Sequence, residues 1–177
     1  MLGRIRASAF AILAAIALAP PALAARMPQL IDQNGHAFTF QTLRGTPLIV
    51  TFIAAHCTQA CPLVNAQFAQ AAQRFAHAHT HVRLLTITLD PEHDSLRDMH
   101  DIARRFNADP RTWIVAGGKR ADVHAIMSAF GVVAQRGRKG YADVHTTFVY
   151  YIDAGGNVRK TILASTALTD QLVEMAR

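Results

Sequence analysis

The stretch that decides the fold is Thr51-Phe52-Ile53-Ala54-Ala55-His56-Cys57-Thr58-Gln59-Ala60-Cys61-Pro62, which holds both cysteines of the 177-residue chain. The apolar, β-rich run at residues 47–52 is typical of a strand buried on both faces. Pro62 fits the first turn of a helix, where its missing N–H costs nothing. We therefore place the two sulfurs on the loop and first turn between a strand and a helix, where the positive helix end favours thiolate.

The N-terminal residues predict export. Two arginines precede an apolar run at residues 7–19, and Ala22-Leu23-Ala24 forms a small-x-small cleavage site. We expect a secretory signal peptide at residues 1–25 and a mature domain at residues 26–177. An uncleaved membrane anchor is the alternative, but the apolar run falls short of the roughly 20 residues that span a bilayer. No cysteine follows this run to carry a lipid. An exported chain, expected in a bacterial periplasm, can form disulfides.

Composition limits the classes of function. The net charge of +6 is dispersed, with no run of like charges, so nucleic-acid binding has no specific support. The basic stretch at residues 136–140 is interpreted as a solvated loop. The length after the signal is sufficient for one domain with its own core.

Strand and helix patterns alternate along the mature chain. The chain opens with a hairpin around Asn34-Gly35 and closes with a hairpin around residues 153–157 and a helix. Ser95 and Asp98 form a capping-box pattern. The expected strands lie at residues 29–32, 37–40, 47–52, 82–89, 112–116, 145–152 and 158–163, and the expected helices at 63–76, 96–106, 121–130 and 168–176. This order predicts an α/β fold, similar to the thioredoxin-like fold, with a mixed central sheet and helices on both faces.

Three motifs lie beside the ends of these strands: the first two follow a strand, and the third enters the C-terminal hairpin. They are His56-Cys57-x-x-x-Cys61-Pro62, Ile87-Thr88-Leu89-Asp90-Pro91-x-x-Asp94 and Val144-His145-Thr146. Together they resemble the Sco/SenC (PrrC-like) family of copper chaperones over nearly all of the mature chain. The resemblance implies that Cys57, Cys61 and His145 bind one copper ion. It also implies delivery of that copper to the cytochrome c oxidase subunit that carries the binuclear copper centre, with other periplasmic copper carriers or thiol reductants as further partners.

The residue types support this interpretation on their own. Two thiolates and one imidazole suit monovalent copper, and with an added ligand they could hold the divalent ion. Zinc would usually want a fourth ligand. Three residues separate Cys57 from Cys61, about one helical turn, so the pair can chelate one ion or, after local adjustment, form a disulfide. Oxidation would remove both thiolates at once, so copper loading should require the reduced form.

Other functions of the cysteine pair stay open. The main alternative is a thiol-disulfide oxidoreductase, in which Cys57 and Cys61 form the catalytic redox pair that reduces target cysteines before metal insertion. Thioredoxin-type reductases resemble one another in having a proline before the hairpin strand that faces the cysteines, whereas this chain has His145 there and no proline after Pro110. A structural disulfide would close a very short loop and add little stability. A peroxiredoxin-like peroxidase would need a threonine and an arginine around its cysteine.

The sequence also departs from the family pattern and offers further polar residues. Thr58-Gln59 replaces the usual Pro-Asp after the first cysteine, and Val144 replaces an acid before the histidine, which bears on affinity and partner choice. Three further sets of polar residues lie outside the expected ligand set. His56 could tune the Cys57 thiolate or simply end a strand. The histidines His77, His79 and His81 could hold a second metal or form a polar connector. Asp90 and Asp94 could orient the site or serve turn and cap chemistry.

Overall fold

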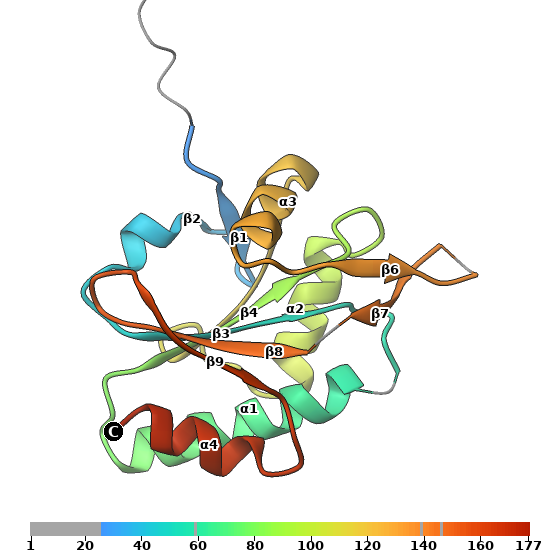
Figure 1. Ribbon diagram of the computed structural model, residues 1–177. Helices are drawn as coiled ribbons and strands as arrows, with labels where there is room; N and C mark the ends of the chain where they lie inside the picture. The colour runs from blue at the N-terminus through green and yellow to red at the C-terminus, as the bar shows by residue number, and fades with distance from the viewer. Residues whose placement is uncertain (1–25, 59, 139, 146) are drawn as a thin grey trace, which may run out of the picture.

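The computed structural model describes residues 26–58, 60–138, 140–145 and 147–177, with the backbone alone at residues 143–145 (Figure 1). The expected signal peptide at residues 1–25 lies outside this description. No helix within the described ranges is long and apolar enough to cross a bilayer.

The elements follow the expected alternation of strands and helices. The described strands are β1 (Leu30–Asp32), β2 (Ala37–Phe38), β3 (Leu48–Ile53), β4 (Arg83–Thr88), β5 (Trp113–Gly118), β6 (Ala134–Arg136), β7 (Ala142–His145), β8 (Phe148–Ile152) and β9 (Val158–Leu163). The helices are α1 (Ala60–His77), α2 (Leu96–Arg105), α3 (Arg120–Ala129) and α4 (Leu168–Met175), with a 3-10 helix at Phe40–Leu43.

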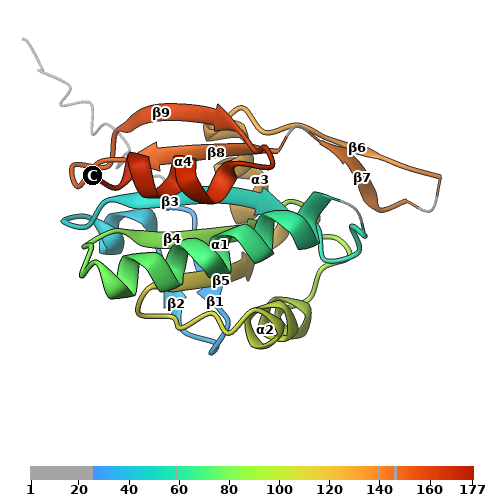
Figure 2. The same ribbon diagram turned by 90° about the horizontal axis from the view of Figure 1, so that it is seen from below.

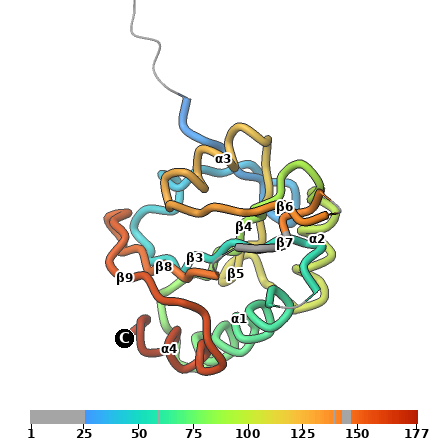
Figure 3. Tube along the Cα trace, turned by 45° about the vertical axis from the view of Figure 1, so that its right-hand side comes forward, coloured from blue at the N-terminus to red at the C-terminus, as the bar shows by residue number. Residues whose placement is uncertain are grey.

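Seven strands form one mixed sheet in the order β2-β1-β5-β4-β3-β8-β9. The central strands β3, β4 and β5 are parallel, and β8 runs antiparallel to β3. Helices α1, α2 and α4 pack on one face and α3 covers the other. In Figure 3, α3 lies above the sheet and α1 and α4 lie below it. The predicted thioredoxin-like arrangement is therefore confirmed.

Alternation along β3 explains why both faces are apolar. Ile49 and Ile53 face the helices α1, α2 and α4, whereas Val50 and Phe52 face α3, and all four are at most 2% exposed. Such a strand is buried from both sides, as residues 47–52 predicted. β3 ends at the edge of the sheet formed by the carboxyl ends of the parallel strands, and the loop with Cys57 follows it there.

Two local signals in the sequence are confirmed, one at the N-terminus of a helix and one at a hairpin turn. The capping box forms at α2, where Ser95 Oγ accepts from the Asp98 amide and the Asp98 carboxylate accepts from the Ser95 amide. Gly35 has a φ of +87°, a conformation that glycine adopts without strain, and it closes the turn between β1 and β2.

Four expected boundaries are wrong by two residues or more. Strand β5 runs to Gly118, beyond the expected end at residue 116. Helix α1 begins at Ala60, earlier than the expected residue 63. The second N-terminal strand ends at Phe38, and the chain enters a 3-10 helix. The expected strand at residues 145–152 is two strands, because β7 pairs with β6 in a separate two-stranded sheet and only β8 joins the main sheet. Figure 2 shows this β6–β7 hairpin extending beyond the main sheet.

Candidate functional site

The two cysteines lie where the sequence predicted, in the loop after β3 and the first turn of α1. A turn closed by the Cys57 amide and the Ala54 carbonyl oxygen, 3.2 Å apart, follows the end of β3. The Cys61 amide then donates to Cys57 Sγ at 3.4 Å. Cys57 Sγ therefore sits against the N-terminal amides of α1, where the helix dipole favours a thiolate or another anionic sulfur ligand.

The two thiols differ in exposure. Cys61 is 2% exposed and belongs to the core, whereas Cys57 is half-buried. A hydrogen bond with the Cys57 side chain and burial together raise the pKa of the Cys61 thiol. In the reduced protein without metal, Cys61 is thus held as a thiol, and a metal ion that binds there must displace its proton.

His145 is the third residue of the predicted ligand set. Its backbone ends β7 opposite Ala134 in β6. Because β8 runs antiparallel to β3, β8 begins at the sheet edge where β3 ends and the cysteine loop follows. The side chain of His145 lies outside the described atoms, so its ligand role stays a prediction. Within the described side chains, no three His, Cys, Asp or Glu residues group closely enough to hold a metal ion.

Asp94, for which the sequence left open a role in orienting the site or in turn and cap chemistry, contacts the cysteine loop directly. Its Oδ2 accepts from the Thr88 hydroxyl at 2.6 Å and from the Ala55 amide at 3.0 Å. Burial raises the pKa of Asp94, partly offset by these two hydrogen bonds. Asp94 therefore fixes the backbone two residues before Cys57.

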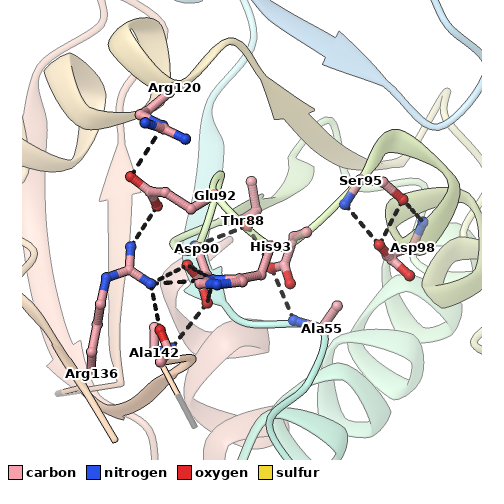
Figure 4. A network of polar contacts seen from close by, with 12 residues as sticks. Ala55, Thr88, Asp90, Glu92, His93, Ser95, Asp98, Arg120, Arg136 and Ala142 are labelled. Atoms are coloured by element: carbon pink, nitrogen blue, oxygen red, sulfur yellow. Dashed lines mark hydrogen bonds and ion pairs between the residues drawn. The ribbon is translucent and has the colours of Figure 1, made fainter.

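Asp90 begins the same turn and contacts the β6–β7 hairpin instead (Figure 4). Its side chain has no exposed surface. Oδ1 accepts from Arg136 at 2.9 Å and Oδ2 accepts from the Ala142 amide at 2.9 Å, while His93 Nδ1 lies within 3.1 Å of both oxygens. Burial alone would raise the pKa of Asp90, but the bonds from Ala142, His93 and Arg136 lower it overall.

Arg136 corrects the interpretation of residues 136–140 as a solvated loop. Besides Asp90, its guanidinium donates to Glu92 Oε2 at 2.6 Å and to the Gly140 carbonyl oxygen at 2.8 Å. Glu92 in turn binds His124 and Arg120 of α3. A charged network thus joins the hairpin, the turn after β4 and α3.

An aromatic contact links the hairpin to the cysteine loop. The Tyr141 ring lies 4.3 Å from the His56 ring and 4.8 Å from the His93 ring, measured between centroids. His56 therefore packs against an aromatic neighbour, a role that fits its interpretation as a strand-end histidine. Nothing in the sequence around Tyr141 indicated this contact, because it depends on a hairpin that the patterns did not predict.

The three alternating histidines lie away from this site. His77 ends α1 and His79 and His81 lie in the connection to β4, all exposed. His79 adopts a φ of +51°. Among the described side chains, these histidines do not form a group that could hold a metal ion.

Comparison with known proteins decides the family. The SCO1/SenC family model matches residues 20–177. The chain belongs to the SCO1/SenC family. A SCO1 protein homolog of Bacillus subtilis is 19% identical to this SCO1/SenC chain over 131 residues, which cover 73% of this chain and 68% of the relative.

Solved structures show the same fold. The structure of Bradyrhizobium japonicum ScoI with copper bound is 24% identical, with a TM-score of 0.71 over 83% of this chain and 96% of that one. BsSco, described as a member of the Sco family of cytochrome c oxidase assembly proteins with a disulfide switch, is 18% identical, with a TM-score of 0.69 over 83% and 88%. At these identities the likeness establishes the SCO1/SenC fold.

Proposed function

We propose that this SCO1/SenC protein is an exported copper chaperone that binds one copper ion through Cys57, Cys61 and His145. The observation that carries the proposal is the contact between the Cys61 amide and Cys57 Sγ, which brings two soft ligands together at a helix N-terminus. The copper-bound structure of the B. japonicum relative supports copper as the ion. One monovalent copper would displace the proton of each thiol and leave the protein as a thiolate complex.

The proposed receiver is the subunit of cytochrome c oxidase that carries the binuclear copper centre. Support comes from family membership and from the description of BsSco as an assembly protein of that oxidase. Transfer would proceed by ligand exchange, in which each thiolate is replaced by a ligand of the receiver. The half-buried position of Cys57 makes it the accessible ligand to exchange first, because Cys61 is enclosed by the core.

Export is part of the proposal. Residues 1–25 have the pattern of a cleaved signal peptide, so the working form would begin near residue 26 in the periplasm. Mass spectrometry of the protein isolated from the periplasmic fraction should give the mass of a chain that begins at residue 25 or 26. The mass of the full-length chain, recovered from the membrane fraction, would favour the uncleaved anchor.

Copper titration tests the ligand set. The reduced protein should take up one monovalent copper per chain, and His145→Ala should weaken binding and remove imidazole features from the spectrum of the divalent copper form. His81→Ala is the matched control, because His81 is an exposed histidine outside the site, and it should bind copper as the wild type does. Equal affinity and spectra for His145→Ala and the wild type would remove His145 from the ligand set.

A thiol-disulfide oxidoreductase is the second candidate, favoured by the same sulfur contact and by the disulfide switch described for BsSco. The Cys57 thiolate would attack a target disulfide and release one target thiolate. Cys61 would then attack the Cys57 sulfur, which forms the internal disulfide and releases the second. A thiol reductant would restore the pair. Fast insulin reduction with such a donor, without copper uptake, would rank this function first.

A further inference from the structure

The β6–β7 hairpin that carries His145 is attached to the body of the protein by polar contacts and by the packing of Ala134 and Ala142 on the core. It belongs to a separate two-stranded sheet. A half-open cavity of about 530 Å³ separates it from α3, lined by Ala134, Arg136 and Ala142 on the hairpin side and by His124 and Met127 on the helix. Apolar packing on that side is therefore incomplete, which leaves a larger share of the hairpin's attachment to polar contacts.

Arg136 is the residue best placed to set that direction. Its guanidinium reaches across the hairpin to the Gly140 carbonyl oxygen and, at the same time, to Asp90 and Glu92 of the body (Figure 4). The Ala142 amide, on the opposite strand, binds the second oxygen of Asp90. Both strands of the hairpin are thus attached to one buried carboxylate, which fixes their orientation as well as their position.

The same turn also holds the loop that carries Cys57, a second part of the predicted ligand set. Asp94 accepts from the Ala55 amide in the cysteine loop, four residues after Asp90 accepts from the hairpin. The turn is short and leads directly from the buried strand β4. It therefore fixes the separation between the cysteine loop and the hairpin.

A change in hairpin direction would shift His145, which lies between two attachments. Ala142 is held by Asp90, and β8 of the main sheet begins at Phe148. At about 3.3 Å per residue, His145 lies roughly 10 Å beyond Ala142 along β7, so a tilt of about 10° at Ala142 moves it by at most about 2 Å. Metal–ligand distances vary by only about 0.2 Å. Loss of the Arg136 contacts would thus displace His145 without unfolding the main sheet.

We infer that Arg136 is a positioning residue for copper binding, which directs the hairpin so that His145 reaches the ion held by Cys57 and Cys61. The inference rests on the proposed function. The expected effect of Arg136 reaches copper through His145, because Arg136 binds the hairpin and the start of the turn, whereas Asp94 and Thr88 hold the cysteine loop. The ring contact between Tyr141 and His56 also joins the hairpin to that loop, so a double-mutant cycle is needed to separate the two routes.

The test is a double-mutant cycle on the reduced protein, with affinity measured by competition with a chromogenic chelator of monovalent copper. Arg136→Gln should weaken copper binding by about 10- to 100-fold, the range for residues that orient a ligand. In the His145→Ala background the same substitution should have no further effect. Arg138→Gln is the matched control: it removes the same charge from the same hairpin, at an exposed arginine with no ion pair among the described residues, and should bind as the wild type does.

A spectroscopic measurement separates positioning from folding. In the divalent copper form, Arg136→Gln should reduce the nitrogen hyperfine splitting in electron paramagnetic resonance while thiolate-to-copper absorption persists. If Arg136→Gln fails to fold, Glu92→Gln replaces it, because this variant keeps the buried contact with Asp90 and weakens the outer one. It also weakens the contacts of Glu92 with His124 and Arg120, and it should give a smaller loss that again depends on His145.

The outcomes distinguish this inference from the proposed function. If the wild type takes up no copper, both are refuted. If the wild type binds copper and His145→Ala weakens it, but Arg136→Gln binds as tightly as the wild type, the inference alone is wrong. It is also wrong if Arg136→Gln causes the same loss with and without His145, since the arginine would then act on the cysteines or on the fold.

Discussion

The main sheet and the β6–β7 hairpin are held by different forces. In the sheet, strands such as β3 are fully buried and helices cover both faces. In the hairpin, β6 is short and largely exposed, and charged groups attach the hairpin to a turn of the body. Apolar packing gives the sheet its stability, whereas hydrogen bonds and ion pairs give the hairpin its direction.

This division suits a metal-binding site. The cysteine loop comes from the sheet and from the first turn of the longest helix, so its position is set by the core. His145 comes from the hairpin, whose attachment can be altered without loss of the core. The two halves of the predicted ligand set should therefore respond to different substitutions.

The largest effect is expected in the core of the sheet. Trp113 has no exposed surface, packs on Phe68 with ring centroids 5.9 Å apart, and donates to the Thr86 hydroxyl. Trp113→Ala should lower the free energy of unfolding by about 3–5 kcal/mol. Val133→Ala, at a 73% exposed residue next to β6, is the comparison and should change it by less than about 0.5 kcal/mol. Urea unfolding followed by circular dichroism measures both.

The second effect is expected at the buried anchor of the hairpin. Asp90→Ala leaves the Ala142 amide and Arg136 without their partner, which should lower stability by about 1–3 kcal/mol. Amide hydrogen exchange should speed up in β6 and β7 and stay unchanged in β3 and β4. Asp170→Ala, which removes a largely exposed carboxylate, is the control. Uniformly faster exchange across the sheet would contradict a local role.

A smaller effect is expected where the hairpin touches the cysteine loop. Tyr141→Ala removes two ring contacts, with His56 and His93, and aromatic pairs contribute about 0.5–1.5 kcal/mol each. Tyr141→Phe keeps the ring at this position, and with it both ring contacts, and should match the wild type. The His56 ring protons, followed by NMR, should shift in the first variant only. A shift of equal size in Tyr141→Phe would assign the effect to the hydroxyl.

The smallest effect is a loss of stability at acidic pH, expected from Asp153 in the turn between β8 and β9. The Asn157 amide and Arg159 lower the pKa of Asp153 to about 2. Because the folded-state pKa lies below the unfolded value, this contribution is complete above about pH 4 and is lost as the pH falls towards 2. Asp153→Asn should flatten the stability profile in this window. The Asp153 carboxyl carbon, titrated by NMR, should show a midpoint near 2; a midpoint near 4 would refute the assignment.

Much of the main sheet was predictable because its signals are local. The apolar run of β3, the capping box of Ser95 and the glycine turn at Gly35 each depend on a few neighbouring residues, and all are confirmed. The cysteine pair was placed correctly for the same reason, since the strand before it and Pro62 after it fix the loop between them.

The hairpin was not predictable in the same way. Ala134-Gln135-Arg136 lacks the alternation that marks a strand, and its pairing with β7 includes an irregular register between Gln135 and Arg136. Its attachment is made by charges far apart in the chain, such as Arg136 with Asp90. Single-chain patterns indicate polar residues at such positions, but they do not show which carboxylate an arginine reaches. For this reason the sequence left the roles of Asp90 and Asp94 open between orienting the site and turn or cap chemistry, and it did not indicate their partners.

The complete burial of Asp90 has a consequence for the medium in which the protein works. Dissolved ions weaken attractions between exposed charges over distances of about 8 Å at physiological ionic strength, but they screen buried pairs much less. Arg136 is partly exposed, yet its partner Asp90 is closed to solvent. The hairpin should thus keep its direction when the salt content of the surrounding solution rises or falls.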